Sequence, residues 1–147
     1  IGWEADQESY DAAMEAANPL SGAIESRIAQ SKEDLATYLE THPITWTDRE
    51  QYSITAEKQA QLTSKIMAAS MAQTLSQPYT LTWNSTGQVC REWTLQDLSA
   101  LAFAIDARVT ALVSYQQTQE VAMRNAATRE ELDAIVVDYD SVPEVTE

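Results

Sequence analysis

The sequence predicts a mainly α-helical fold of the α+β class, with long helices and two small β-hairpins. Apolar residues recur at helical spacing over most of the 147 residues. Two short segments, each with a tryptophan, alternate apolar residues with threonines as half-buried strands do. A threonine suited to cap a helix follows each of them. We expect an N-terminal helical arm over 1–43, a hairpin–helix/hairpin–helix domain over 44–137 and an acidic tail over 138–147.

The arm is expected to begin with a short helix over residues 1–18. Asn18-Pro19 ends this helix, because proline lacks an N–H donor and disfavours helical geometry in the residue before it. The spacing of the apolar residues places them along one stripe, formed by Trp3, Tyr10, Met14 and Ala17.

A second helix is expected over 21–41, before the helix-ending pair His42-Pro43. Ser31 with Asp34 could cap a fresh start, so one straight helix and two helices joined by a kink are both open. The apolar seam of this helix contains Ile24, Ile28, Leu35 and Tyr38.

Residues 44–54 are predicted to form the first hairpin, around the polar tip Asp48-Arg49-Glu50. Thr55 is expected to cap a helix that runs to about residue 75. This helix is apolar on two sides, with Leu62, Ile66 and Ala69 nearly opposite Met67, Met71 and Leu75. Such a helix is usually sandwiched between elements or between subunits. The side with the methionines is expected to be core more often than interface.

Residues 79–93 are predicted to form the second hairpin, in which Gly87 takes a left-handed turn position. Trp83 and Trp93 are expected to be largely buried against helices. Thr94 is expected to cap a helix from Leu95 to about Asn125.

The two hairpin–helix segments share one plan, which indicates either a repeated unit or chance, since Thr and Trp are common in strands. In the repeated unit, the two hairpins pair into one small antiparallel sheet.

The long helix carries a seam spaced alternately by four and three residues, as in a coiled coil. Its members are Leu98, Ala102, Ile105, Val109, Leu112, Gln116, Gln119 and Met123. Gln116 and Gln119 place amides at seam positions, where they either fix packing with a partner or a second copy, or lie in solvent. Beyond this helix, Thr128 and Glu131 predict a capping box. The acidic residues 138–147 show no period and are expected to form a flexible tail.

Charge and composition exclude several classes of function. A formal charge of -14 argues against a nucleic-acid partner and against anionic membranes. No apolar run approaches the roughly 20 residues that span a bilayer. One His and one Cys exclude a Cys/His zinc site. The first residues contain no basic start typical of a signal peptide. Because the chain begins with Ile1 rather than Met, we expect that residues upstream were removed or left out.

No catalytic, cofactor-binding or metal-binding set is predicted. A nucleophilic Cys90 would need a base, and the only His, His42, ends a helix elsewhere in the sequence. Cys90 is therefore expected to be a partly buried strand residue. Asp138, Asp140 and Glu144 imitate the spacing of a calcium loop but lack its glycine. A cell-wall-directed hydrolase that uses dispersed carboxylates is the least favoured hypothesis.

The segment "LTWNSTGQVCREWTLQDLSALAFAIDARVTALVSYQQTQEVAMRNAATREELDAI" resembles the C-terminal domain of many tail-associated proteins of bacteriophages and prophages. "SITAEKQAQLTSKI" upstream also fits, so the resemblance covers roughly residues 45–137. It rests on packing and capping residues, and it implies association with a phage tail, baseplate or receptor-binding apparatus.

We therefore expect a non-enzymatic structural protein of the phage virion, made in the bacterial cytoplasm and packed against other tail proteins or its own copies. An assembly chaperone for tail or tail-fibre proteins is the alternative. The residues predicted to form interfaces are Trp3, Tyr10, Met14, Ile24, Ile28, Gln116, Gln119 and Met123.

Overall fold

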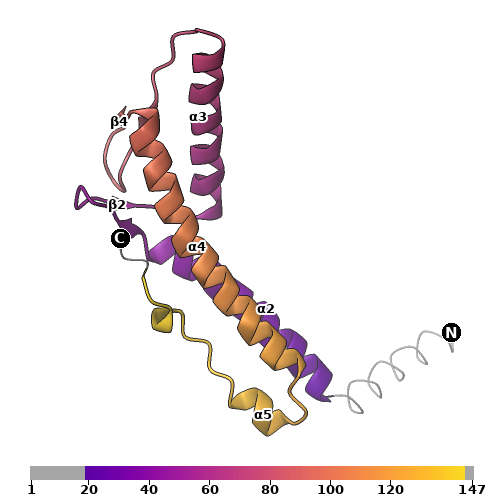
Figure 1. Ribbon diagram of the computed structural model, residues 1–147. Coiled ribbons are helices and arrows are strands. Elements are labelled where there is room, and N and C mark those ends of the chain that lie inside the picture. Colours follow the sequence, from indigo (N-terminus) through magenta and orange to yellow (C-terminus); the bar gives the residue numbers. More distant parts are fainter. Residues whose placement is uncertain (1–18, 145–147) are drawn as a thin grey trace, which may run out of the picture.

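The computed structural model describes residues 19–144, which form four α-helices and two small antiparallel sheets (Figure 1). This confirms the predicted mainly α class with small β elements. The helices are α2 (Pro19–Thr41), α3 (Ala56–Thr74), α4 (Leu95–Arg124) and α5 (Arg129–Asp133), followed by the 3-10 helix η1 (Tyr139–Ser141). The strands are β1 (Ile44–Thr45), β2 (Gln51–Tyr52), β3 (Thr82–Trp83) and β4 (Arg91–Glu92). The predicted helix with Trp3, Tyr10 and Met14 lies outside the described residues.

Helix α4 is the central element, and both α2 and α3 pack along it (Figure 1). α3 lies beside the first half of α4, and α2 beside the second half. The α4 seam is buried as predicted, with Leu98 and Leu112 fully inaccessible and Ile105 3% exposed. Full burial of such side chains contributes about 1.5–3 kcal/mol each. The seam therefore anchors two helices rather than one.

Three helices begin with the predicted threonine caps. The Thr55 hydroxyl accepts from Lys58 N at 3.2 Å, and that of Thr94 accepts from Asp97 N at 3.0 Å. Thr128 accepts from Glu131 N at 3.1 Å in the same way. Each cap satisfies a backbone donor that no helical carbonyl can reach.

The two hairpins form separate two-stranded sheets, so the prediction of one shared sheet is wrong. Each ladder is only two residues long. The hairpins meet instead where Thr86 N, in the second turn, donates to Gln51 O at 2.8 Å. A turn cannot extend a strand ladder, because its backbone groups do not lie in one line. Gly87 has φ +80, which confirms its left-handed position in that turn.

Helix α2 is continuous, and the kinked alternative is wrong. Ser31 is 2% exposed and its hydroxyl donates to Ile28 O at 2.7 Å, within the helix. It therefore does not cap a new start. Residues 19–41 pack against the rest of the fold, where Ile28 and Leu39 are buried.

The segment after α5 is packed rather than free through residue 144, in contrast to the predicted flexible tail. Tyr139 is 6% exposed and Val142 is 8% exposed. Asp138 caps η1 by accepting from Asp140 N at 3.1 Å. Two apolar side chains in an otherwise acidic stretch are enough to fasten it to the core.

Helix α4 is, among the described residues, the one helix long and apolar enough to cross a membrane by length and composition alone. Its most apolar window has a mean hydropathy of 1.4. It is not an unbroken apolar run, because the charged residues Asp106 and Arg108 interrupt it. In the structure, its apolar seam forms part of the core.

Replacing Leu112 with Ala should lower the free energy of unfolding by about 2–5 kcal/mol, because it opens a cavity in the buried seam. Phe103→Ala on the same helix is the control, since Phe103 is 77% exposed and its loss should change stability by no more than about 0.5 kcal/mol. Urea unfolding followed by circular dichroism measures both. Equal losses would contradict the central role of the seam.

Candidate functional site

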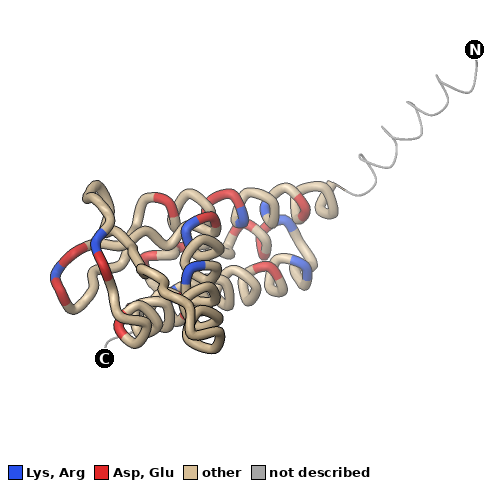
Figure 2. Tube along the Cα trace, turned by 90° about the horizontal axis from the view of Figure 1, so that it is seen from above, with Lys and Arg blue, Asp and Glu red and all other residues tan. Residues whose placement is uncertain are grey.

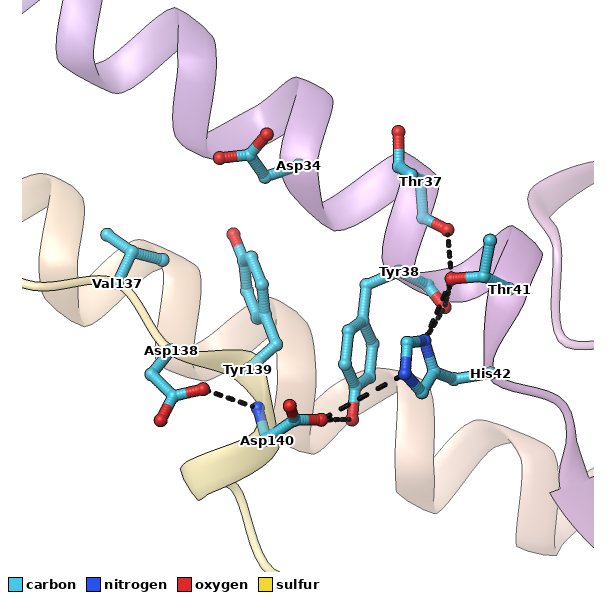
Figure 3. Close-up of a pocket in the computed structure, with 9 residues that line it drawn as sticks. All are labelled: Asp34, Thr37, Tyr38, Thr41, His42, Val137, Asp138, Tyr139 and Asp140. Atoms are coloured by element: carbon cyan, nitrogen blue, oxygen red, sulfur yellow. Dashed lines mark hydrogen bonds and ion pairs between the residues drawn. The ribbon is translucent and has the colours of Figure 1, made fainter.

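A shallow pocket of about 250 Å³ lies between the end of α2 and the C-terminal segment (Figure 3). It is open to solvent. Polar side chains from both segments line it, namely Asp34, Thr37, Tyr38, Thr41, His42, Asp138 and Asp140, together with Val137 and Tyr139. Its lining includes one histidine and three aspartates, so these groups decide whether chemistry is possible there.

His42 is held in place by contacts within this pocket. Its ring stacks on Tyr38, with centroids 3.8 Å apart and planes 10° from parallel. Nδ1 lies 2.8 Å from Thr41 Oγ1, and Nε2 lies 4.0 Å from Asp140 Oδ1. The ring thus lies between the end of α2 and Asp140 of the C-terminal segment.

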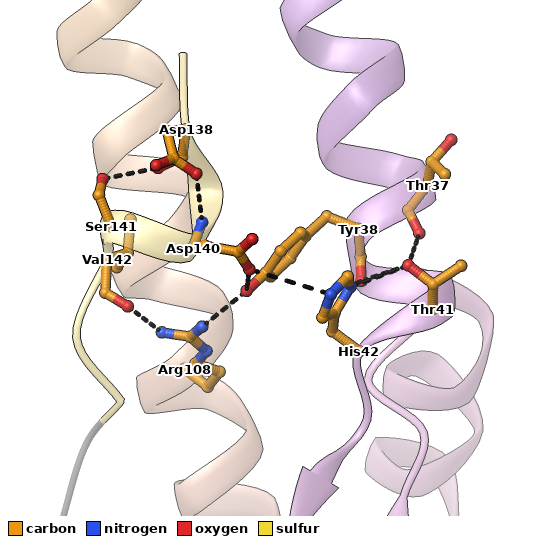
Figure 4. A network of polar contacts seen from close by, with 9 residues as sticks. All are labelled: Thr37, Tyr38, Thr41, His42, Arg108, Asp138, Asp140, Ser141 and Val142. Carbon is orange, nitrogen blue, oxygen red and sulfur yellow. Dashed lines mark hydrogen bonds and ion pairs between the residues drawn. The ribbon is translucent and has the colours of Figure 1, made fainter. Parts of the chain in front are cut away.

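A buried guanidinium holds the same segment from the opposite side (Figure 4). Arg108 on α4 is 7% exposed and donates to Val142 O at 3.0 Å and Pro143 O at 3.1 Å. It also donates to the Tyr38 hydroxyl at 3.3 Å, which in turn donates to Asp140 Oδ1 at 3.0 Å. We call Tyr38, Arg108, Asp140 and the carbonyls of Val142 and Pro143 the C-terminal clamp. It joins α2, α4 and the last described residues.

Tyr139 inserts between α2 and α4 beside the clamp. Its hydroxyl donates to Ser31 O, and its ring packs against Tyr38 and Tyr115. Burial, together with the negative charge of Asp34, raises the pKa of Tyr139 to about 12. Burial and the hydrogen bond to Asp140 also raise the pKa of Tyr38.

The carboxylates of this region serve structural roles. Asp138 caps η1, and Asp140 accepts from Tyr38. Across residues 19–144, no group of three or more His, Cys, Asp or Glu residues is placed to hold a metal ion. The pocket and the clamp thus act chemically as a fastening, built from groups that satisfy one another.

Cys90 lies on the second hairpin and is exposed, whereas a partly buried strand residue was predicted. Its Sγ lies 3.7 Å from Asn84 Oδ1. The side chain of its neighbour Arg91 instead reaches Asp48 at 3.1 Å and stacks 4.0 Å from the Trp93 ring centroid. Trp93 is half-buried, and Trp83 is 4% exposed as predicted.

The contact between Arg91 and Asp48 joins the two hairpins. Tyr52 adds its hydroxyl, which donates to Asp48 Oδ2 at 2.7 Å. Partial burial alone would raise the pKa of Asp48. The hydrogen bonds from Tyr52 and from Glu50 N, with the charge of Arg91, lower it on balance.

Among the predicted interface residues, Trp3, Tyr10 and Met14 lie outside the described residues. The others face inward. Ile28 and Met123 are buried together in a small core with Leu132, and Ile24 packs against it. Their contacts with other proteins stay a prediction.

Gln116 is 4% exposed, and its amide donates to Ser31 Oγ at 3.1 Å and to Glu120 Oε1 at 3.2 Å. Gln119 is half-buried. The seam amide of Gln116 therefore binds α2 of the same chain and does not lie in solvent.

The second apolar side of α3 was predicted, but it is exposed rather than part of the core. Met67, Met71 and Leu75 are 60%, 59% and 63% exposed, so the prediction of a core role for the methionines is wrong. We call these three residues the α3 stripe. α3 packs on α4 only through the opposite side, where Leu62 and Ala69 are buried. One signal in the sequence was available, because no charged residue occurs between Lys65 and Arg91, and this stretch is tan throughout Figure 2.

A family model described as "Domain of unknown function (DUF4376)" matches residues 22–137, which is more than half of the chain. The match begins inside α2, and so includes most of a helix that sequence reasoning had set apart from the domain. No curated protein and no solved structure matches the chain.

Arg108→Ala should loosen the C-terminal segment, because it removes the donors of two backbone carbonyls. Hydrogen bonds to charged groups contribute about 1.5–3 kcal/mol, so amide hydrogen exchange over 138–144 should accelerate about tenfold or more. Arg129→Ala is the control, since it breaks an exposed ion pair with Asp133 worth about 0.5 kcal/mol or less. Unchanged exchange in Arg108→Ala would show that the clamp does not hold the segment.

The free energy of unfolding should fall between pH 10 and about pH 12, because the folded chain retains the Tyr139 proton more strongly than the unfolded chain. Stabilisation is complete below pH 10. Tyr139→Phe should cost about 1 kcal/mol at neutral pH through the lost hydrogen bond and make the alkaline decline shallower. Part of the alkaline decline should remain in this variant, because the pKa values of Tyr38 and Tyr52 are also raised in the folded chain. Tyr79→Phe, at an exposed position, should leave the pH profile unchanged in urea titrations.

Proposed function

The chain belongs to the DUF4376 family. We propose that it is a non-enzymatic packing component of a bacteriophage tail, baseplate or receptor-binding apparatus. The phage setting is supported by the resemblance of residues 45–137 to tail-associated proteins. The mode of action is supported by a single structural observation, the exposed α3 stripe.

The α3 stripe supports docking because its members line up. Residues four apart lie on the same side of a helix, so the three side chains form one continuous ridge. Isolated exposed apolar residues are common, whereas contiguous ones mark interaction sites. Each side chain buried by a partner would contribute on the order of 1–2 kcal/mol.

The two polar networks described above bind groups within the fold. The clamp fastens the C-terminal segment, and the ion pair of Asp48 with Arg91 joins the hairpins. Within residues 19–144, in contrast, no element covers the large apolar side chains of the α3 stripe. A docked partner would account for them.

The assembly chaperone is the second candidate, and the chemistry of the stripe favours it in one respect. Met67 and Met71 have flexible, polarisable side chains that adapt to more than one apolar partner. A chaperone would use the same face and leave before the particle matures.

Mass spectrometry of purified particles from the phage or prophage that encodes this chain tests the proposal. We expect the chain at a fixed ratio to other tail proteins, and we expect Met71→Glu to reduce its incorporation about tenfold or more, because a buried charge is costly. Ala36→Glu, an exposed position on α2, is the charge-matched control.

Three outcomes are informative. A chain that is absent from particles, but whose Met71→Glu variant blocks tail assembly, is a chaperone. A chain absent from particles whose deletion leaves tails intact contradicts both candidates. Normal incorporation of the Met71→Glu variant would show that the stripe is not the docking face.

A further inference from the structure

We infer that the α3 stripe binds the α3 stripe of a second copy, with the two helices antiparallel and crossing at the level of Ala69. This inference rests on the proposed use of the stripe as a packing face, and it names the partner.

Charge is the first argument. Two copies that each carry a formal charge of -14 repel one another wherever their acidic surfaces approach within about 8 Å, the Debye length in physiological salt. α3 carries only Glu57, Lys58 and Lys65, all before the stripe, and the chain is uncharged from there to Arg91. A strongly basic partner would be drawn to the acidic surfaces instead. Two acidic copies can therefore meet at the stripe without bringing charges of the same sign close together.

The sizes of the side chains give the orientation. The ridge begins at the exposed Thr63 and continues through Met67 and Met71 to Leu75, so it is small at one end and large at the other. In an antiparallel pair centred on Ala69, Leu75 of each copy lies over Thr63 of the other. Met67 then faces Met71. Large against small fills the contact, whereas a parallel pair would leave a gap between two threonines.

The extent of the face predicts the strength of the pair. At 1.5 Å per residue, the 19 residues of α3 span about 28 Å. One face of a helix this long is smaller than the roughly 800 Å² per partner of a stable complex. We therefore expect a reversible dimer that forms at about ten to several hundred micromolar chain, and that a repeating assembly would strengthen through several contacts at once.

Sedimentation velocity of the full chain over this concentration range tests the pairing. We expect a concentration-dependent dimer, and a dissociation constant that rises about tenfold or more in Met71→Glu but stays unchanged in Ala36→Glu. Both positions are exposed, so both variants should keep the wild-type circular dichroism spectrum.

Disulfide trapping tests the orientation. Cys90 is an exposed free thiol, so the Cys90→Ser background removes it. In that background, a mixture of Met67→Cys and Met71→Cys chains should cross-link faster than either variant alone. Faster cross-linking of each variant alone would overturn the antiparallel arrangement.

A chain that is monomeric at every concentration, or a dimer that Met71→Glu leaves intact, overturns the inference. Wild-type binding to neutral phosphatidylcholine vesicles without a dimer would assign the stripe to lipid and overturn it as well. If the chain is monomeric while Met71→Glu is lost from particles, this inference fails and the proposed function stands. If the chain forms the dimer in solution but is absent from particles, the inference stands and the proposed structural role in the particle fails.

Discussion

The apolar seam of α4 is the constraint on which the rest of the fold depends. A helix of 30 residues is about 45 Å long, and neither α2 with 23 residues nor α3 with 19 can cover it alone. The two helices instead lie one after the other along the seam and cover it together. The first hairpin follows from this, because it lies between the end of α2 and the start of α3.

Covering one seam with two helices also leaves surface unused. α2 gains further cover from α5 and from the C-terminal segment, which the clamp holds down. α3 also contacts the second hairpin, where Lys65 Nζ donates to Thr82 Oγ1 at 3.1 Å, but among the described residues no element covers the α3 stripe, so its outer side stays open. An open apolar side of a helix and an uncharged stretch of sequence coincide at the α3 stripe, and this coincidence supports a packing role for α3.

Local patterns predicted the elements well, while contacts between distant residues were hidden. Caps such as Thr94, the left-handed Gly87 and the α4 seam depend on neighbours a few residues away, which spacing reveals. Gln116 could not be paired in advance with Ser31, 85 residues earlier. The clamp likewise depends on backbone carbonyls that carry no sequence signal. The methionine side of α3 was misassigned because composition alone does not distinguish a core face from a docking face.

Ser31 has a consequence for how the chain folds as it is made. Its hydroxyl binds Gln116, and its carbonyl binds Tyr139, 108 residues later. α2 is synthesised before these partners, which lie 85 and 108 residues later in the chain. Its apolar seam therefore stays uncovered until they have been made, and the nascent chain depends on long-range closure, which is slow compared with local helix formation.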